Sequence, residues 1–122
     1  MRILLADDQA TVRSALQLIL EEDAELDVVG EATEAGELLA QVEMACPDLV
    51  LLDWELPGSQ AADLLSALRQ RLPHLVVIAL SGRPEARQSA LTAGADAFVS
   101  KGDPPERLLA TLNGCCRRGG VR

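Results

Sequence analysis

Five short apolar runs recur along the chain, and each is followed by a segment with helical period. The runs lie at 3–6, 26–32, 48–53, 75–80 and 97–100. Three of them are almost continuous Val, Ile and Leu, which is typical of strands buried on both faces of a parallel sheet. The pattern therefore predicts five strands that alternate with helices.

The segments between the runs carry apolar residues at intervals of three and four, which place one stripe on each helix. The first three stripes are Val12, Ala15, Leu16, Ile19 and Leu20, then Leu38, Leu39 and Val42, then Leu64, Leu65, Leu68 and Leu72. A fourth helix is predicted over 84–93, opening with Pro84 and stopping at Gly94. The fifth is predicted to start with Asp103 as N-cap and Pro104 as its first residue.

Strand–helix alternation without a linker predicts one α/β domain with a parallel sheet and right-handed crossovers. The length of 122 residues suits a single core. In such doubly wound sheets, ligands bind beyond the carboxyl ends of the strands, where the strand order reverses. Residues that follow the strands are therefore the candidates for chemistry.

Four of the five predicted strands end in a conspicuous polar residue. Asp7 and Asp8 follow the first strand, Asp53 the third, Ser81 the fourth and Lys101 the fifth. Two carboxylates about 4 Å apart near a surface repel by about 4 kcal/mol, so the cluster favours a cation. Mg²⁺ takes one or two carboxylates and leaves positions for phosphate oxygens. A lysine and a hydroxyl suit a phosphoryl group, and a carboxylate can accept one.

Each of these residues alone has an ordinary structural interpretation. Asp8 alone is better explained as a cap of the following helix, Ser81 with Gly82 as a turn, and Lys101 as a solvated loop residue. Their joint occurrence after strands one, three, four and five favours a phosphoryl-transfer site.

Composition excludes several other classes. The net charge of −8 argues against nucleic-acid binding by this domain. Cys46, Cys115 and Cys116 lack metal-binding spacing, so reduced thiols are expected, and His74 receives no role. No apolar run reaches the roughly 20 residues of a membrane span, and no signal-peptide core is present. We expect a cytoplasmic protein without a membrane partner.

The order of these residues resembles the receiver domain of two-component response regulators, over essentially all of residues 1–116. That family has an acidic pair after the first strand, a phosphoacceptor aspartate after the third, serine or threonine after the fourth and lysine after the fifth. Its Asp-x-x-x-Pro-Gly loop is matched by DWELPG at 53–58, and its Gly-Ala-x-x-aromatic-x-x-Lys run by GADAFVSK at 94–101. Both runs look most like NarL/LuxR-type transcription regulators.

The resemblance implies a flavodoxin-like (βα)5 three-layer sandwich with strand order 2-1-3-4-5. It implies a signalling switch rather than a turnover enzyme. A sensor histidine kinase would phosphorylate Asp53, with Mg²⁺ held by Asp8, Asp53 and the backbone carbonyl of Glu55, and Asp7 in support. Lys101 would pair with the phosphoryl group, which Ser81 would then approach.

The switch itself would involve the surface of the fourth helix, fifth strand and fifth helix. Phe98 stands at the family's switch aromatic and would follow Ser81 inward; it lacks the hydroxyl of the commoner tyrosine. The loop also lacks a second glycine after Pro-Gly and has 59–62 as SQAA, which is expected to change only the start of the third helix. Glu55 and Arg83 stand at lifetime-tuning positions and are predicted to pair across the site, hindering attack by water.

Two other interpretations compete with this one. Haloacid-dehalogenase-type phosphatases also form aspartyl-phosphate, but their nucleophile lies in an Asp-x-Asp loop after the first strand. A nucleotide-binding module lacks support because no glycine-rich phosphate loop follows any strand.

The output of the switch is open. Residues 117–122 form a basic, linker-like tail. We expect either the receiver part of a DNA-binding regulator, with a helix-turn-helix domain beyond this chain and dimerisation on activation, or a stand-alone receiver acting through protein contacts.

Overall fold

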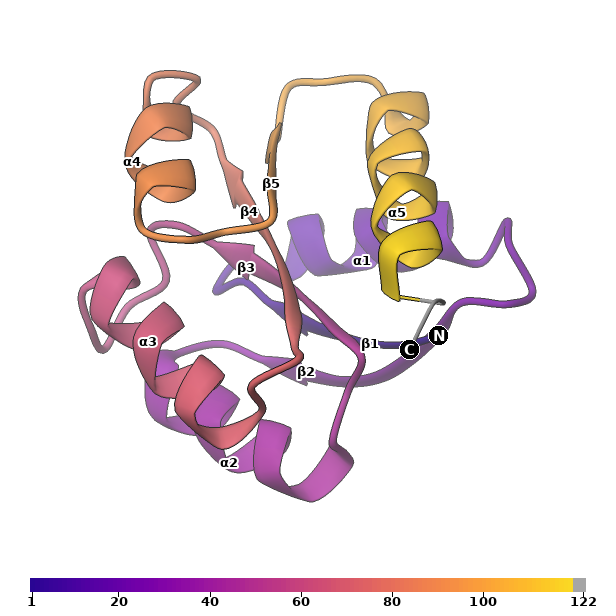
Figure 1. The fold of residues 1–122 in the computed structure, drawn as a ribbon. Helices are drawn as coiled ribbons and strands as arrows, with labels where there is room; N and C mark the ends of the chain where they lie inside the picture. Colours follow the sequence, from indigo (N-terminus) through magenta and orange to yellow (C-terminus); the bar gives the residue numbers. More distant parts are fainter. Residues whose placement is uncertain (120–122) are drawn as a thin grey trace.

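The computed structural model describes residues 1–119, with side chains described through Cys115, and its elements alternate strand and helix throughout (Figure 1). The strands are β1 (Arg2–Ala6), β2 (Asp27–Ala32), β3 (Leu49–Asp53), β4 (Val76–Ser81) and β5 (Ala97–Ser100). The helices are α1 (Ala10–Leu20), α2 (Ala35–Ala45), α3 (Ala61–Arg71), α4 (Ala86–Thr92) and α5 (Pro105–Gly119). All ten predicted elements are confirmed.

The strands form one parallel sheet in the order β2-β1-β3-β4-β5. The chain therefore winds outward from β1 in one direction and from β3 in the other, so the strand order reverses between β1 and β3. Every residue of β3 is buried, as its continuous apolar sequence predicts for a central strand. The predicted strand order and fold class are confirmed.

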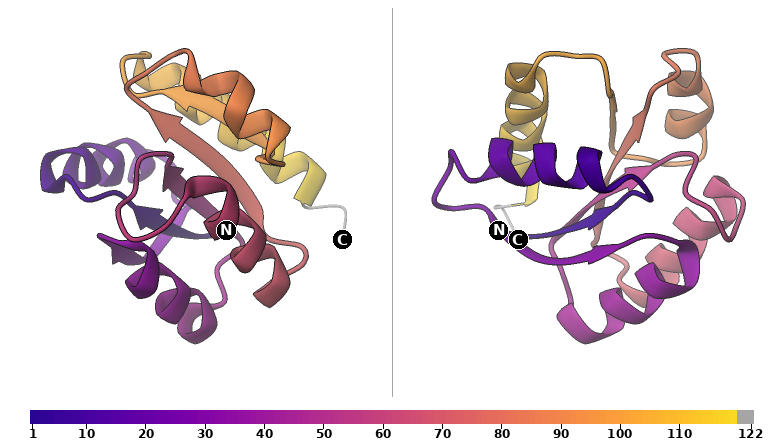
Figure 2. Two further views of the ribbon diagram at one scale, coloured as in Figure 1. Left: turned by 90° about the vertical axis from the view of Figure 1, so that its left-hand side faces the viewer. Right: turned by 180° about the vertical axis from the view of Figure 1, so that it is seen from behind.

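Helices cover both faces of the sheet, which gives three layers (Figure 2). Helices α1 and α5 pack on one face over a core that includes Leu16, Leu20, Leu108 and Leu112. Helices α2, α3 and α4 pack on the other face over a core that includes Leu38, Leu64 and Leu68. Alternate residues of each strand supply the two cores, since successive strand side chains point to opposite faces.

Two helix starts differ from the prediction. Helix α4 begins at Ala86, because residues 83–86 form a turn in which the Ala86 N–H donates to the Arg83 carbonyl at 3.0 Å. Helix α5 begins at Pro105, and the Asp103 carboxylate accepts the Ser100 N–H at 3.1 Å. Both starts lie within two residues of a proline, where φ is restricted and turn and helix geometries are similar.

The last helix extends into the segment predicted as a tail. Helix α5 continues to Gly119, past the predicted domain boundary at 116, and residues 120–122 of the tail lie outside the described residues. Cys115 is buried and Cys46 is exposed, while the Cys116 side chain is outside the described part. Within the described chain, no helix is both long and apolar enough to cross a membrane.

Candidate functional site

The carboxyl ends of the strands bring the predicted polar residues together. Asp7 and Asp8 follow β1, Asp53 ends β3, Ser81 ends β4 and Lys101 follows β5. The gap between β1 and β3 is the point where the strand order reverses, and the acidic residues lie there. This is the place where parallel α/β sheets bind ligands.

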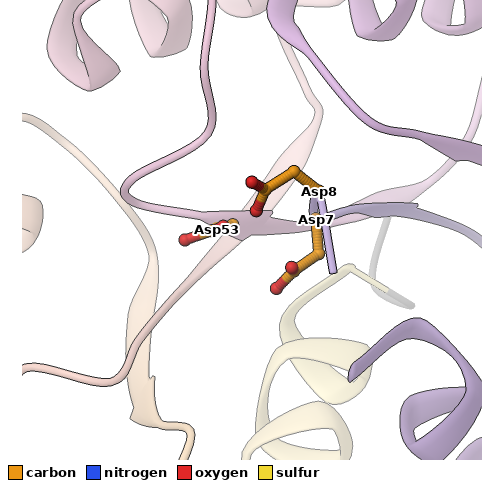
Figure 3. A group of neighbouring side chains, drawn as sticks. All are labelled: Asp7, Asp8 and Asp53. Carbon is orange, nitrogen blue, oxygen red and sulfur yellow. The ribbon is translucent and has the colours of Figure 1, made fainter. Parts of the chain in front are cut away.

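The three aspartates form a compact acidic cluster. One carboxylate oxygen from each of Asp7, Asp8 and Asp53 lies within 4.8 Å of the others. Asp7 is 0% exposed and Asp53 is 2% exposed, whereas Asp8 is exposed to solvent. Figure 3 shows Asp7 and Asp8 leaving the end of β1 in different directions, with Asp53 beside them on the neighbouring strand. The two adjacent aspartates are therefore not equivalent.

Lys101 is the cation that contacts this cluster directly. Its Nζ lies 2.7 Å from Asp7 Oδ2 and 3.5 Å from Asp53 Oδ2. Burial on its own would lower the pKa of Lys101, but the hydrogen bond and charge of Asp7, with the charge of Asp53, raise it above the ordinary value. Lys101 therefore stays charged and lies closer to Asp7 than to Asp53.

Asp53 combines burial with incomplete charge compensation. Its Oδ1 accepts the Glu55 N–H at 2.9 Å, and its Oδ2 has the longer contact to Lys101. Desolvation raises the pKa of Asp53, and the charges of Asp7 and Glu55 add to the rise, while the Glu55 N–H and Lys101 oppose it. A cation beside this carboxylate would offset the cost of its charge.

Ser81 is buried and makes a hydrogen-bonded link across the mouth of the site. Its hydroxyl lies 2.9 Å from Glu55 Oε1 and 3.0 Å from Glu55 Oε2, to which it donates. Its oxygen accepts the Arg83 N–H at 3.0 Å, and Arg83 Nη2 lies 3.0 Å from Glu55 Oε2. The predicted Glu55–Arg83 ion pair is present. The bond from Ser81 to Glu55 was not predicted.

Phe98 and Trp54 are buried in the core beneath the site, on the face covered by α2, α3 and α4. The Phe98 ring is 8% exposed and shares this core with Ala86 and Ala90 of α4. Trp54 is also 8% exposed and directly follows Asp53. The aromatic predicted to move inward therefore lies inside in this structure.

A pocket of about 290 Å³ opens at the cluster. Asp8, Gln9, Asp53, Glu55, Gly82 and Lys101 line it. Its oxygen ligands suit a hard divalent cation such as Mg²⁺, which prefers carboxylates, carbonyls and water. Lys101 at the edge leaves room for an anionic group beside that cation. The residues present therefore fit a magnesium and phosphate site.

Some contacts of the site could not be read from the sequence. Arg13 donates to the Asp7 backbone carbonyl, and the Gln9 N–H donates to Asp7 Oδ1 at 2.9 Å. Gln9, not Asp8, is the N-cap residue of α1, so capping does not explain Asp8. One sequence feature could have indicated the Arg13 contacts. Glu31 is an acidic residue within an apolar strand run, and it pairs with Arg13.

The chain is similar to a known protein family and to several known proteins. The family model described as response regulator receiver domain matches residues 3–113. The DNA-binding transcriptional activator DevR/DosR of Mycobacterium tuberculosis is 39% identical over 102 residues, covering 82% of this chain and 47% of that protein. The nitrate/nitrite response regulator NarL of Escherichia coli strain K12 is 34% identical over 113 residues, covering 91% and 52%.

A solved structure agrees with the fold. The CheY-like response regulator receiver domain protein from Methanospirillum hungatei has a TM-score of 0.83 at 31% identity, covering 98% of this chain and 96% of that one. The chain spans about half the length of the curated relatives that it matches.

Proposed function

This chain belongs to the response regulator receiver domain family, and we propose that it is a phosphorylation-dependent switch with Asp53 as phosphoacceptor. The observation that carries the proposal is the buried Asp53 carboxylate, which faces a pocket shared with Asp8 and Lys101. The other buried aspartate of the cluster, Asp7, is already paired with Lys101 at 2.7 Å. Asp53 is thus the buried carboxylate with the weaker compensation.

The residues divide the chemistry among them. Asp8, Asp53 and the backbone carbonyl of Glu55 would hold Mg²⁺, with Asp7 in support. When bound, Mg²⁺ neutralises oxygen charge on the incoming phosphoryl group. A carboxylate oxygen of Asp53 attacks phosphorus, and the bond from phosphorus to the phosphodonor's histidine nitrogen breaks. Lys101 then balances charge on the transferred group.

Ser81 and Phe98 would pass the change to the surface. To hydrogen-bond a phosphoryl oxygen, the Ser81 hydroxyl must leave Glu55, with which it is now bonded at 2.9 Å. Phe98 lies in the same core as two buried residues of α4, so its packing can report the change to the surface of α4, β5 and α5. A local charge event would then bias a two-state element.

The partners follow from the family. Response regulators receive phosphoryl groups from histidine kinases, and we propose a sensor histidine kinase as phosphodonor. DevR/DosR is described as a DNA-binding transcriptional activator, which favours a transcriptional output through a helix-turn-helix domain outside this chain, with dimerisation on activation. A stand-alone role through protein contacts is the alternative.

Trp54 provides the test. Its buried indole directly follows Asp53, so Mg²⁺ and then beryllium fluoride, a phosphoryl mimic, should each change its fluorescence. Asp53→Asn should abolish the second response, and Asp63→Asn, on the exposed side of α3, should retain both. A flat titration of the wild-type chain, or a response that survives in Asp53→Asn, would contradict the proposal.

A further inference from the structure

Arg13 links three segments at the base of the acidic cluster. It lies in the first turn of α1, and its Nη1 donates to the Asp7 backbone carbonyl at 2.8 Å. Its Nε donates to Glu31 Oε1 of β2 at 2.7 Å, and Gln17, one turn further along α1, donates to the other Glu31 oxygen. The Arg13 side chain is only 17% exposed. The Arg13 guanidinium, which forks to two acceptors, therefore lies against the protein rather than in solvent.

The carbonyl that Arg13 binds belongs to the peptide unit joining Asp7 to Asp8. Because that unit is planar, a hydrogen bond to its oxygen fixes the direction in which the chain continues to the Asp8 Cα. The N–H of Asp7 is fixed as well, because it donates to the Ala32 carbonyl at 3.0 Å. The backbone that carries Asp8 is thus held from β2 on one side and by Arg13 on the other.

Asp8 depends on this backbone support more than its neighbour does. The Asp7 side chain is buried and bonded to the Gln9 N–H and Lys101. The Asp8 carboxylate is exposed, and within the described residues no hydrogen bond or ion pair holds it. Its approach to Asp53 (Figure 3) therefore depends on the backbone that carries it.

We infer that Arg13 is a positioning residue for Mg²⁺, acting through the Asp7–Asp8 peptide on the ligand Asp8. This inference rests on the proposed function. Groups that orient metal ligands from behind typically change metal affinity by about 10- to 100-fold when removed. The positive charge of Arg13 would by itself oppose a cation, but the Glu31 carboxylate at 2.7 Å neutralises it. The fork therefore provides orientation without repulsion.

The chain contains a matched control at the other end of the sheet. Arg69 of α3 also donates to a backbone carbonyl, that of Gly94 at 3.1 Å, and to a carboxylate, that of Asp96 at 2.7 Å. Arg13→Met and Arg69→Met remove the same charge and the same two kinds of bond. Only the first contacts the backbone of the acidic cluster.

The test is a titration of the wild-type chain and both variants with MgCl2 alone, followed by amide NMR shifts around Asp8 and Glu55. Arg13→Met should bind Mg²⁺ about 10-fold more weakly, even though the negative charge that it leaves on Glu31 would by itself favour the cation. Arg69→Met should bind Mg²⁺ as the wild type does. Thermal unfolding without metal measures stability separately. The charge-balanced double variant Arg13→Met/Glu31→Gln should be at least as weak as Arg13→Met.

Three results would overturn the inference. Equal Mg²⁺ affinity of Arg13→Met and Arg69→Met would show that Arg13 supports only the fold. Wild-type affinity in the double variant, which lacks the Arg13 bond without the added charge, would show that the Asp7–Asp8 peptide needs no support from Arg13. A wild-type chain that ignores Mg²⁺ would overturn the proposed function together with the inference. If Arg13→Met does not fold, Arg13→Lys against Arg69→Lys makes the same comparison, since lysine keeps the charge and cannot fork to both acceptors.

Discussion

Asp96 at the amino-terminal end of the sheet and Asp53 at the carboxyl-terminal end have opposite surroundings. Asp96 Oδ2 accepts the Val77 N–H at 2.8 Å and an Arg69 N–H at 2.7 Å, and the pair is about one-third exposed. Asp53 is buried beside Asp7, and the two share Lys101, which lies closer to Asp7. Both ends carry carboxylates, but among the described residues the buried carboxylates lie at the carboxyl-terminal end, where one lysine serves two of them.

The difference separates structural from functional polar residues. A carboxylate with full hydrogen bonding and an arginine stabilises the loops that it joins. A buried carboxylate with less compensation costs folding free energy and favours a ligand that removes the cost. Residue type alone does not distinguish the two cases, whereas the local charge balance does.

The largest expected effect on stability comes from removing the charge of Lys101, which Asp7 and Asp53 share. Lys101→Met should lower the free energy of unfolding by about 3 kcal/mol without Mg²⁺, because two buried carboxylates then face each other without a cation. Urea unfolding with and without MgCl2 measures it, and Mg²⁺ should restore part of the loss by binding only the folded chain. A loss that Mg²⁺ does not reduce would show that the carboxylates do not form a cation site.

Neutralising one carboxylate at each end should change stability in opposite directions. Without Mg²⁺, Asp53→Asn should raise the free energy of unfolding by about 1 kcal/mol, since it removes uncompensated buried charge while Lys101 keeps Asp7. Asp96→Asn should lower it by about 1.5 kcal/mol, since Arg69 loses its charged partner. Urea unfolding of the two variants in EDTA measures both, and changes of the same sign would contradict the comparison.

A pH series sharpens the same comparison. Burial raises the pKa of Asp53 above its ordinary value of 3.8, so the folded state binds this proton more tightly than the unfolded state. The wild type should therefore lose stability, relative to Asp53→Asn, as the pH rises above 3.8 through the raised pKa. The advantage of Asp53→Asn should be smallest at low pH and constant once Asp53 is ionised in both states.

Unfolding free energies of both chains in EDTA, from about pH 3.5 to about pH 7.5, give this difference. An advantage of Asp53→Asn that shrinks as the pH rises would show that burial does not disfavour the charged form of Asp53.

Much of this arrangement could be predicted from the sequence, for physical reasons that differ between residues. Continuous apolar runs locate the strands, and parallel strands end at the same edge, so Asp7, Asp53, Ser81 and Lys101 could be brought together from their positions alone. The strand order β2-β1-β3-β4-β5 came from the family resemblance, since periodicity does not specify which strands are neighbours. Helix α4 begins two residues late because a turn at Arg83 uses the same proline-led sequence as a helix start.

The contacts that were missed involve backbone atoms or a choice between partners. The bond from Arg13 to the Asp7 carbonyl has no side-chain signature at Asp7. The family pattern assigns Ser81 to the phosphoryl group, and no sequence feature indicates that its hydroxyl donates to Glu55 in this state. Charge complementarity did predict that Glu55 pairs with Arg83, which lies 3.0 Å away.

The smallest expected effect concerns that ion pair, which covers the excess charge of the carboxyl-terminal end. Glu55→Ala and Arg83→Ala should each accelerate loss of the phosphoryl group from Asp53 by up to about fivefold, because an exposed ion pair contributes at most about 1 kcal/mol. Glu55→Ala should have the larger effect, since it also releases the Ser81 hydroxyl from its acceptor. The decay of radiolabelled phosphoprotein in Mg²⁺ after removal of the phosphodonor measures the rate.

The Arg71–Glu43 pair, exposed and 3.8 Å long, provides the control, and its alanine variants should lose the phosphoryl group at the wild-type rate. Unchanged rates in both Glu55→Ala and Arg83→Ala would show that the pair does not restrict water, and the lifetime would then depend on groups deeper in the site, Lys101 and Ser81 first.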